Sequence, residues 1–184
     1  MLSNPTNFYE ALMKKFNRLL LGTLVVTAML GTTNTFAGGK PACRINGTVS
    51  YVYTGTSFAP TGNIQFSQTG ILEINRNNSV SGEGTITFQF PNFNGQGPLW
   101  LLLNEVQTNG VITQDPANPC VGNADFLATA TVVNSSNPAI VPPGFVLYAD
   151  AQRSISFAAA LKGDQVNLIS TSPGTIASGT GFKQ

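Results

Sequence analysis

Two glutamates are the acids in this chain that are best placed to do chemistry. Glu83 and Glu105 are each flanked by apolar, strand-like sequence. If either side chain points into a protein interior, the loss of hydration raises its pKa and makes it a candidate general acid or base. The alternative is an outward-facing strand acid that discourages edge-to-edge pairing of sheets. The sequence assigns no catalytic residue, and Glu83 and Glu105 are the two candidates.

Most of the other acids after residue 38 lie beside turns or basic residues. Glu73 with Arg76, and Asp150 with Arg153, are expected to form solvent-facing pairs at the ends of hairpins. Exposed pairs of this kind contribute about 0–1 kcal/mol to stability. We therefore expect both pairs to lie outside any functional site.

Several common chemistries are excluded by composition. The chain has no histidine, which removes histidine-based acid–base catalysis, nucleophile activation and metal ligation. No Asp-x-Asp loop is present to hold calcium, and a serine nucleophile would lack its G-x-S-x-G turn and a base. The glycine pairs at 82–84 and 95–97 lack the third glycine and the helix of a phosphate cradle, so they predict hairpins or bulges. We expect no metal and no cofactor, and the sequence leans towards a protein that is not an enzyme.

Charged residues are scarce, at 9% of the chain, and the formal net charge is +1. In an average protein about a quarter of the residues are charged. A strongly basic surface is therefore missing, and we expect no nucleic-acid partner. The apolar fraction of 42% is enough for a folded core, so disorder is not expected.

The N-terminal segment has the pattern of a bacterial secretory signal peptide. Three basic residues precede the apolar stretch Leu19–Leu30, which is too short for an ordinary transmembrane helix. The signal peptide is predicted to cover residues 1–37, with cleavage after Ala37, and Met13 is the expected true start. Residues 38–184 then form a single domain without a transmembrane span. An uncleaved membrane anchor is the alternative.

The only two cysteines of the chain are Cys43 and Cys120. Export places them in the periplasm or outside the cell, where oxidising conditions allow a disulfide to form and persist. We therefore expect a Cys43–Cys120 disulfide. A single catalytic thiol is the alternative, but no histidine is present to lower the pKa of a thiol.

Apolar and polar side chains alternate along the chain after residue 38. A two-residue period with many threonines and aromatic residues is typical of β-strands. Turn residues interrupt these runs about every ten to fifteen residues. The alternating apolar residues are Val49, Tyr51 and Tyr53; Ile64 and Phe66; Leu72 and Ile74; Ile86, Phe88 and Phe90; Phe126, Ala128, Ala130 and Val132; and Ile155, Phe157, Ala159 and Leu161. The turns are expected at 77–78, 94–95, 109–110, 142–144, 163–164 and 173–174.

The run Leu99–Leu103 departs from this alternation because it is continuously apolar. Such a run fits either a strand buried on both sides or a short helix. We favour the strand.

These signals predict an all-β fold of eight to ten strands. Hairpin-length links require antiparallel pairing. Charged side chains at a sheet edge prevent pairing with other chains, and this sequence has few of them. A closed or nearly closed barrel is therefore favoured, because closure removes the edges. A two-sheet β-sandwich is the alternative. An outer-membrane barrel is disfavoured because several of the runs are short.

Aromatic side chains provide the candidate binding residues. They are more numerous than a tightly filled small barrel easily holds, so some are expected to line an apolar ligand cavity. The candidate ligand-binding residues are Tyr51, Tyr53, Phe88, Trp100 and Phe126. Ordinary core packing is the alternative, and the indole N–H of Trp100 needs a partner if it is buried.

Four segments of the chain carry a further signal: Cys43–Tyr51, Ser81–Thr85, Cys120–Gly122 and Ser170–Thr180. They resemble segments of a group of small secreted bacterial β-barrel proteins that are largely uncharacterised. The resemblance implies a calycin-like or allene-oxide-cyclase-like barrel and supplies no catalytic residues. The chain departs from the group at Pro119, where an aspartate often precedes the second cysteine.

Together these observations predict a secreted, non-enzymatic β-barrel protein that binds a small apolar ligand. A structural or adhesive extracellular protein is one alternative, favoured by the low charge and the many asparagine, threonine and glycine residues. A cyclase-like or isomerase-like barrel enzyme, working with one acid and a few polar groups, is another. The sequence specifies neither the ligand nor the oligomeric state.

Overall fold

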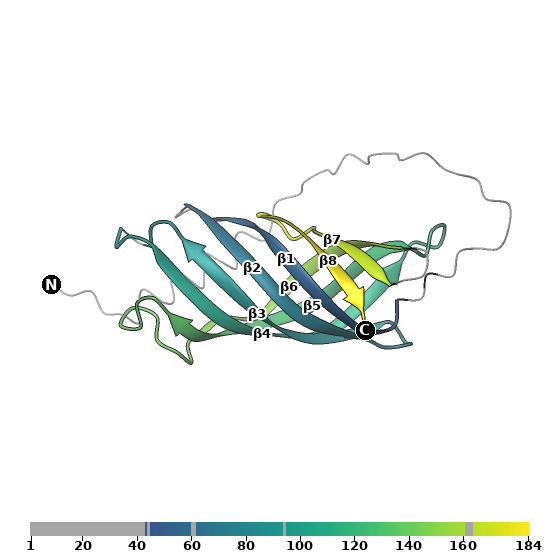
Figure 1. Cartoon of the computed structure of the whole chain (residues 1–184), viewed down its shortest axis with the longest axis horizontal. Coiled ribbons are helices and arrows are strands. Elements are labelled where there is room, and N and C mark those ends of the chain that lie inside the picture. The colour runs from purple at the N-terminus through teal and green to yellow at the C-terminus, as the bar shows by residue number, and fades with distance from the viewer. Residues whose placement is uncertain (1–42, 44, 60–61, 94, 161–163) are drawn as a thin grey trace.

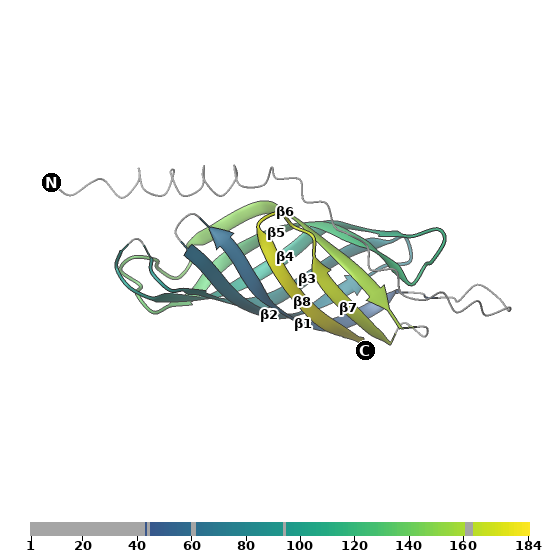
Figure 2. The same cartoon turned by 90° about the horizontal axis from the view of Figure 1, so that it is seen from above.

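The computed structural model is a closed β-barrel (Figures 1 and 2). It describes residues 43, 45–59, 62–93, 95–160 and 164–184. Each strand is antiparallel to its neighbours in sequence order, and the last strand pairs with the first. The strands are β1 (Gly47–Ala59), β2 (Gly62–Ile74), β3 (Ser79–Phe90), β4 (Leu99–Gln114), β5 (Val121–Ser135), β6 (Val146–Ala159), β7 (Gln165–Ser170) and β8 (Thr175–Lys183). The expected antiparallel barrel is confirmed, with eight strands, and the two-sheet sandwich is not formed.

The expected signal peptide and its cleavage site lie outside the described residues. Within the described ranges the chain forms strands, turns and loops, and it contains no helix long and apolar enough to cross a membrane. All eight strands belong to the one barrel.

An asparagine-rich turn joins β2 to β3. Asn78 has a left-handed φ of 65°, a conformation that asparagine adopts more readily than most residues. The side-chain oxygen of Asn77 accepts a hydrogen bond from the backbone N–H of Ser79 at 3.1 Å. Asn75 donates from its side-chain amide to the Ser79 hydroxyl at 3.0 Å. The turn predicted at these positions is confirmed.

The turn predicted at Asn109 and Gly110 is wrong. Both residues lie within β4, where the register with β5 shifts between Thr108 and Val111. Asn109 has a φ of 52°. A β-bulge of this kind adds an unpaired residue and bends a strand without ending it. The strand expected at Leu99–Leu103 therefore continues through Asn109 and Gly110 to Gln114.

The apolar run at the start of β4 is a strand, as expected. Leu101 and Leu103 face the barrel interior and are fully buried, whereas Trp100 between them is 42% exposed on the outer surface. The run is thus buried on its inner side only. Its continuous apolar character reflects an apolar outer surface as well as the core.

The barrel interior contains two apolar clusters, one towards each end. The first consists of Ile45, Val49, Tyr51, Tyr53, Leu72, Ile74, Val80, Ile112, Ala124, Phe126, Ala128, Phe157, Val166, Leu168 and Ala177. The second consists of Ile64, Ile86, Phe90, Leu99, Leu101, Leu103, Ala130, Val132 and Val141. Phe66 and Tyr148 are partly buried and pack against both clusters.

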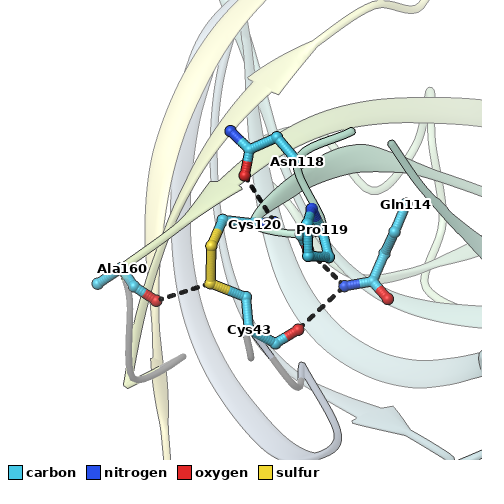
Figure 3. Close-up of a disulfide and its surroundings, with 6 residues drawn as sticks. All are labelled: Cys43, Gln114, Asn118, Pro119, Cys120 and Ala160. Atoms are coloured by element: carbon cyan, nitrogen blue, oxygen red, sulfur yellow. Dashed lines mark hydrogen bonds between the residues drawn. A yellow bond between two sulfur atoms is a disulfide. The ribbon is translucent and has the colours of Figure 1, made fainter. Parts of the chain in front are cut away.

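The disulfide between Cys43 and Cys120 is confirmed (Figure 3). It ties the segment before β1 to the loop between β4 and β5. The side-chain amide of Gln114 donates to the carbonyl of Cys43 at 3.2 Å and to that of Pro119 at 2.6 Å. Because the bridge spans 77 residues of sequence, the loop-entropy estimate of its contribution is large, about 4–5 kcal/mol.

Candidate functional site

Five polar side chains meet inside the barrel, between the two apolar clusters. They come from four strands and are Tyr51 (β1), Gln68 (β2), Glu105 and Gln107 (β4) and Tyr148 (β6). We term them the interior polar cluster. Glu105 is 3% exposed and Gln107 is 2% exposed. Their polar groups are therefore shielded from water and need hydrogen-bond partners within the protein.

The two glutamine amides bridge the Tyr51 hydroxyl and the Glu105 carboxylate. The Gln68 amide donates to the Tyr51 hydroxyl at 2.8 Å and to Oε1 of Glu105 at 2.7 Å. The Gln107 amide donates to the same two acceptors, at 2.8 and 2.9 Å. The Tyr148 hydroxyl donates to the second carboxylate oxygen, Oε2. Each oxygen of this buried carboxylate therefore has a donor, as burial of a carboxyl group requires.

Small residues in the barrel wall make room for this cluster. Gly70 on β2 and Gly84 on β3 face each other in register. They lie in one row of the sheet between Tyr51 and Glu105. A Cβ atom at Gly70 would lie 2.7 Å from the Tyr51 hydroxyl, and one at Gly84 would lie 2.9 Å from it. On the other side of Glu105 the same row continues through Ala130 to Tyr148. Glycine and alanine therefore separate the large polar side chains of this row from one another.

Burial changes the ionisation of the tyrosines in the cluster. Burial raises the pKa of Tyr51 to about 12, the Gln107 hydrogen bond opposes this rise, and the negative charge of Glu105 adds to it. Burial also raises the pKa of Tyr148, and the charge of Glu105 raises it further while Arg153 opposes the rise. Both hydroxyls therefore stay protonated at neutral pH; the Tyr148 hydroxyl donates to Glu105, and the Tyr51 hydroxyl accepts from the two glutamine amides.

Arg153 on β6 lies next to the interior polar cluster. It is half-buried, and its guanidinium carbon lies 4.7 Å from the centre of the Tyr148 ring. The solvent-facing pair expected between Asp150 and Arg153 is therefore wrong, because Arg153 turns inward while Asp150 is exposed. Every other acidic or basic side chain in the described part of the chain is exposed, except Glu105. Among the residues that the structure describes, Glu105 and Arg153 are thus the two charged groups that are not exposed.

Tyr53 is, after Tyr148, a second tyrosine on which the charge of Arg153 acts. Burial raises its pKa, and the Ser170 side chain and the positive charge of Arg153 oppose that rise. Its side chain is 6% exposed, and its hydroxyl makes no hydrogen bond of normal geometry within the described residues. A buried hydroxyl of this kind is unusual in a native protein and has capacity for a further partner.

A ladder of aromatic rings leads from Tyr53 to one end of the barrel. The ring centres of Tyr53 and Phe66 are 5.9 Å apart, as are those of Phe66 and Phe88. The distance from Phe88 to Phe90 is 6.2 Å, and that from Phe90 to Phe93 is 5.4 Å. We term Tyr53, Phe66, Phe88, Phe90 and Phe93 the aromatic ladder. It crosses β1, β2 and β3 and ends in the loop after β3.

The candidate residues from the sequence fall into two groups. Glu105 points inward and meets the condition set for a candidate acid, whereas Glu83 is exposed on the outer surface, which is the alternative given for it. Of the aromatic candidates, Tyr51, Tyr53 and Phe126 are buried in the interior and Phe88 is half-buried there. Trp100 is 42% exposed on the outside, so it does not line the interior as expected.

Sequence reasoning did not identify Gln68, Gln107, Tyr148 or Arg153 as parts of a site. The signal for Gln68 was present, because it shares its position in the alternation with Phe66 and Leu72. A polar residue in the apolar series of a strand marks an inward-facing polar side chain. Arg153 carried the same signal, because it shares its position in the alternation with Ile155 and Phe157. Tyr148 carried none, because the register shifts in β6 separate it from that series.

The residues described by the structure contain no group of three or more histidine, cysteine, aspartate and glutamate side chains that could hold a metal ion. Comparison of the chain with protein-family models, with curated proteins and with solved structures found no match. The resemblance to small secreted bacterial barrels thus stays a prediction.

Proposed function

We propose that this chain is a secreted, non-enzymatic β-barrel protein that binds a small, largely apolar ligand within the barrel. Phe66 and Phe88 lie on the inner face in the middle of the aromatic ladder, yet both are only half-buried. Each Å² of apolar surface that a ligand removes from water contributes about 25 cal/mol to binding. This accessible aromatic surface inside a closed barrel is the observation that carries the proposal.

Two features support secretion. The N-terminal pattern predicts export, and the Cys43–Cys120 disulfide is the kind of bond that persists in oxidising compartments. Cell fractionation with N-terminal sequencing of the product is the test. A chain that begins at residue 38 in the periplasm or the medium supports secretion, and a full-length cytoplasmic chain contradicts it.

Native mass spectrometry of the exported protein, purified without removal of lipids, tests the binding. We expect a co-purifying small molecule. The neutral apolar dye Nile red should also bind, and Phe88→Ala should weaken dye binding several-fold because it removes a ring from the ladder. Phe58→Ala is the matched control, since Phe58 is 42% exposed on the outside. The absence of both a co-purifying molecule and dye binding would contradict the proposal.

Glu105 favours a second candidate, a cyclase-like or isomerase-like enzyme. A buried carboxyl group beside two tyrosine hydroxyls could move a proton to or from a substrate held in the barrel. The substitution Glu105→Gln should then abolish any turnover of the co-purified molecule, while Glu83→Gln on the outer surface should not affect it. Equal turnover by both variants would remove this candidate.

A further inference from the structure

We propose that Arg153 binds a carboxylate at one end of the ligand, so that the ligand is an amphiphile with an acidic head and an apolar body. The inference rests on the proposed function and names the ligand class for the same site. Arg153 has a half-buried position inside the barrel, and no acid in the described part of the chain forms an ion pair with it. Arginine is rarely sequestered without a partner, because removal of its charge from water is costly.

Glu105 does not fill the role of that partner. Its Oε1 accepts from Gln68 and Gln107. Its Oε2 accepts from Tyr148. The acid is therefore satisfied by neutral donors, and every other acid that the structure describes is exposed. Within the described residues the Tyr148 side chain is the partner of the Arg153 guanidinium. A guanidinium has five N–H donors, so donors remain for a further acceptor.

The surroundings of Arg153 suit a carboxylate. The centre of the Tyr148 ring lies 4.7 Å from the guanidinium carbon. A cation–π contact of this kind positions the guanidinium but leaves most of its five N–H donors without a hydrogen-bond acceptor. A planar guanidinium binds a carboxylate through two parallel hydrogen bonds. The buried Tyr53 hydroxyl lacks a hydrogen bond of normal geometry within the described residues. The charge of Arg153 acts on this hydroxyl, which can therefore supply another donor to the same carboxylate.

The position of Tyr53 also sets the direction of the apolar body. The charge of Arg153 lowers the pKa of the Tyr53 hydroxyl against the effect of burial. The ring centre of Tyr53 lies 5.9 Å from that of Phe66. A ligand whose head lies at Arg153 and Tyr53 can therefore extend along Phe66, Phe88 and Phe90 towards the end of the barrel. The acidic head and the aromatic ladder are two parts of one site.

Displacement of Nile red by three probes of equal chain length tests the inference: dodecanoate, dodecan-1-ol and dodecyltrimethylammonium. We expect dodecanoate to bind the wild-type protein about tenfold or more tightly than the alcohol, because charge-assisted hydrogen bonds are the stronger ones. The cation should bind more weakly than the alcohol. If acid and alcohol bind equally, or the cation binds best, the role of Arg153 is wrong while the apolar site stands. If none of the probes binds and Nile red does not bind, both proposals fail.

Substitution of Arg153 locates the effect. In Arg153→Gln, the affinity for dodecanoate should fall to that for dodecan-1-ol, and the affinity for the alcohol should not change. Arg153→Lys keeps the charge without the planar fork, so it should retain part of the preference. Arg76→Gln is the control, because Arg76 is exposed in the turn between β2 and β3. An unchanged preference for the acid in folded Arg153→Gln or Arg153→Lys would overturn the assignment, and the wild-type comparison decides the ligand class even if a variant does not fold.

Discussion

The Tyr51 hydroxyl and the Glu105 carboxylate share the same two hydrogen-bond donors, the side-chain amides of Gln68 and Gln107. Tyr51 is on β1 and Glu105 is on β4, so this relationship links strands that are not neighbours in the sheet. The link crosses the lumen over Gly70 and Gly84, whose missing side chains leave the space. The interior polar cluster therefore stabilises the barrel by linking β1 to β4 across the lumen, in addition to any role in ligand binding.

Removal of the Glu105 acceptor should destabilise the barrel. Glu105→Leu removes the acceptor of the Tyr148 hydroxyl and one of the two acceptors of each glutamine amide, and we expect a loss of about 2–4 kcal/mol in the free energy of unfolding. Glu105→Gln should cost much less, because the Tyr148 hydroxyl can rotate and accept from the new amide. Chemical denaturation measures both. Glu83→Leu on the outer surface is the control, and an equal loss in that variant would contradict the special position of Glu105.

The space over Gly84 should be intolerant of a methyl group. A Cβ there would lie 2.6 Å from the carbonyl oxygen of Thr69 and 2.9 Å from the Tyr51 hydroxyl. We expect Gly84→Ala to lower the free energy of unfolding by about 1–3 kcal/mol through overpacking. Ser81→Ala, at an exposed position of the same strand, should have little effect. A Gly84→Ala protein with wild-type thermal stability would show that the wall and Tyr51 are not in close contact.

The buried tyrosines should resist ionisation in the folded protein. The pKa of Tyr51 is raised to about 12, against about 10 for a free tyrosine, so the protonated form is favoured by folding. This contribution to stability is complete below pH 10 and is lost as the pH rises from about 10 to about 12, since the unfolded chain releases its proton first. Spectroscopic titration should show tyrosinate absorbance appearing together with unfolding. Ionisation of all tyrosines near pH 10 with the fold intact would contradict their burial.

The disulfide should be important for stability. Replacement of Cys43 and Cys120 by alanine removes a constraint that closes 77 residues of sequence, and we expect a loss of about 2–5 kcal/mol. Denaturation curves of the wild-type protein with and without a reducing agent should show a similar difference. The double variant should not respond to the reducing agent. Stability that is the same in oxidised and reduced protein would show that the bridge contributes nothing to the fold.

The sequence predicted the inward-facing aromatic residues well wherever a strand keeps its register. Tyr51 and Tyr53 on β1 share one side of the strand, and so do Phe66 and Gln68 on β2. A two-residue period alone places such residues on the same face. The prediction was weaker for Trp100, because in a continuous apolar run the period gives no information about which face is the inner one.

A bulge in β6 explains why the alternation did not find Tyr148. Tyr148 and Arg153 are five positions apart, so a regular strand would put them on opposite faces. The register of β6 with β5 shifts next to Ala130, and Asp150 has a φ of 50°. The bulge adds a residue and returns Arg153 to the inner face beside Tyr148. The exposed Asp150–Arg153 pair was predicted from the opposite charges alone, although Arg153 shares its position in the alternation with the inward-facing Ile155 and Phe157.

The sequence by itself determined the all-β class, the positions of most strands and the one available disulfide, because these follow from local alternation, turn residues and the presence of two cysteines. The tertiary structure decided which polar residues meet, because Gln107 and Tyr51 are 56 residues apart and come into contact only when the strands curl around a common lumen. Register shifts and closure bring Glu105, Tyr148 and Arg153 together inside the barrel. Hydrogen bonding in a water-poor interior depends on these distances, which no local pattern contains.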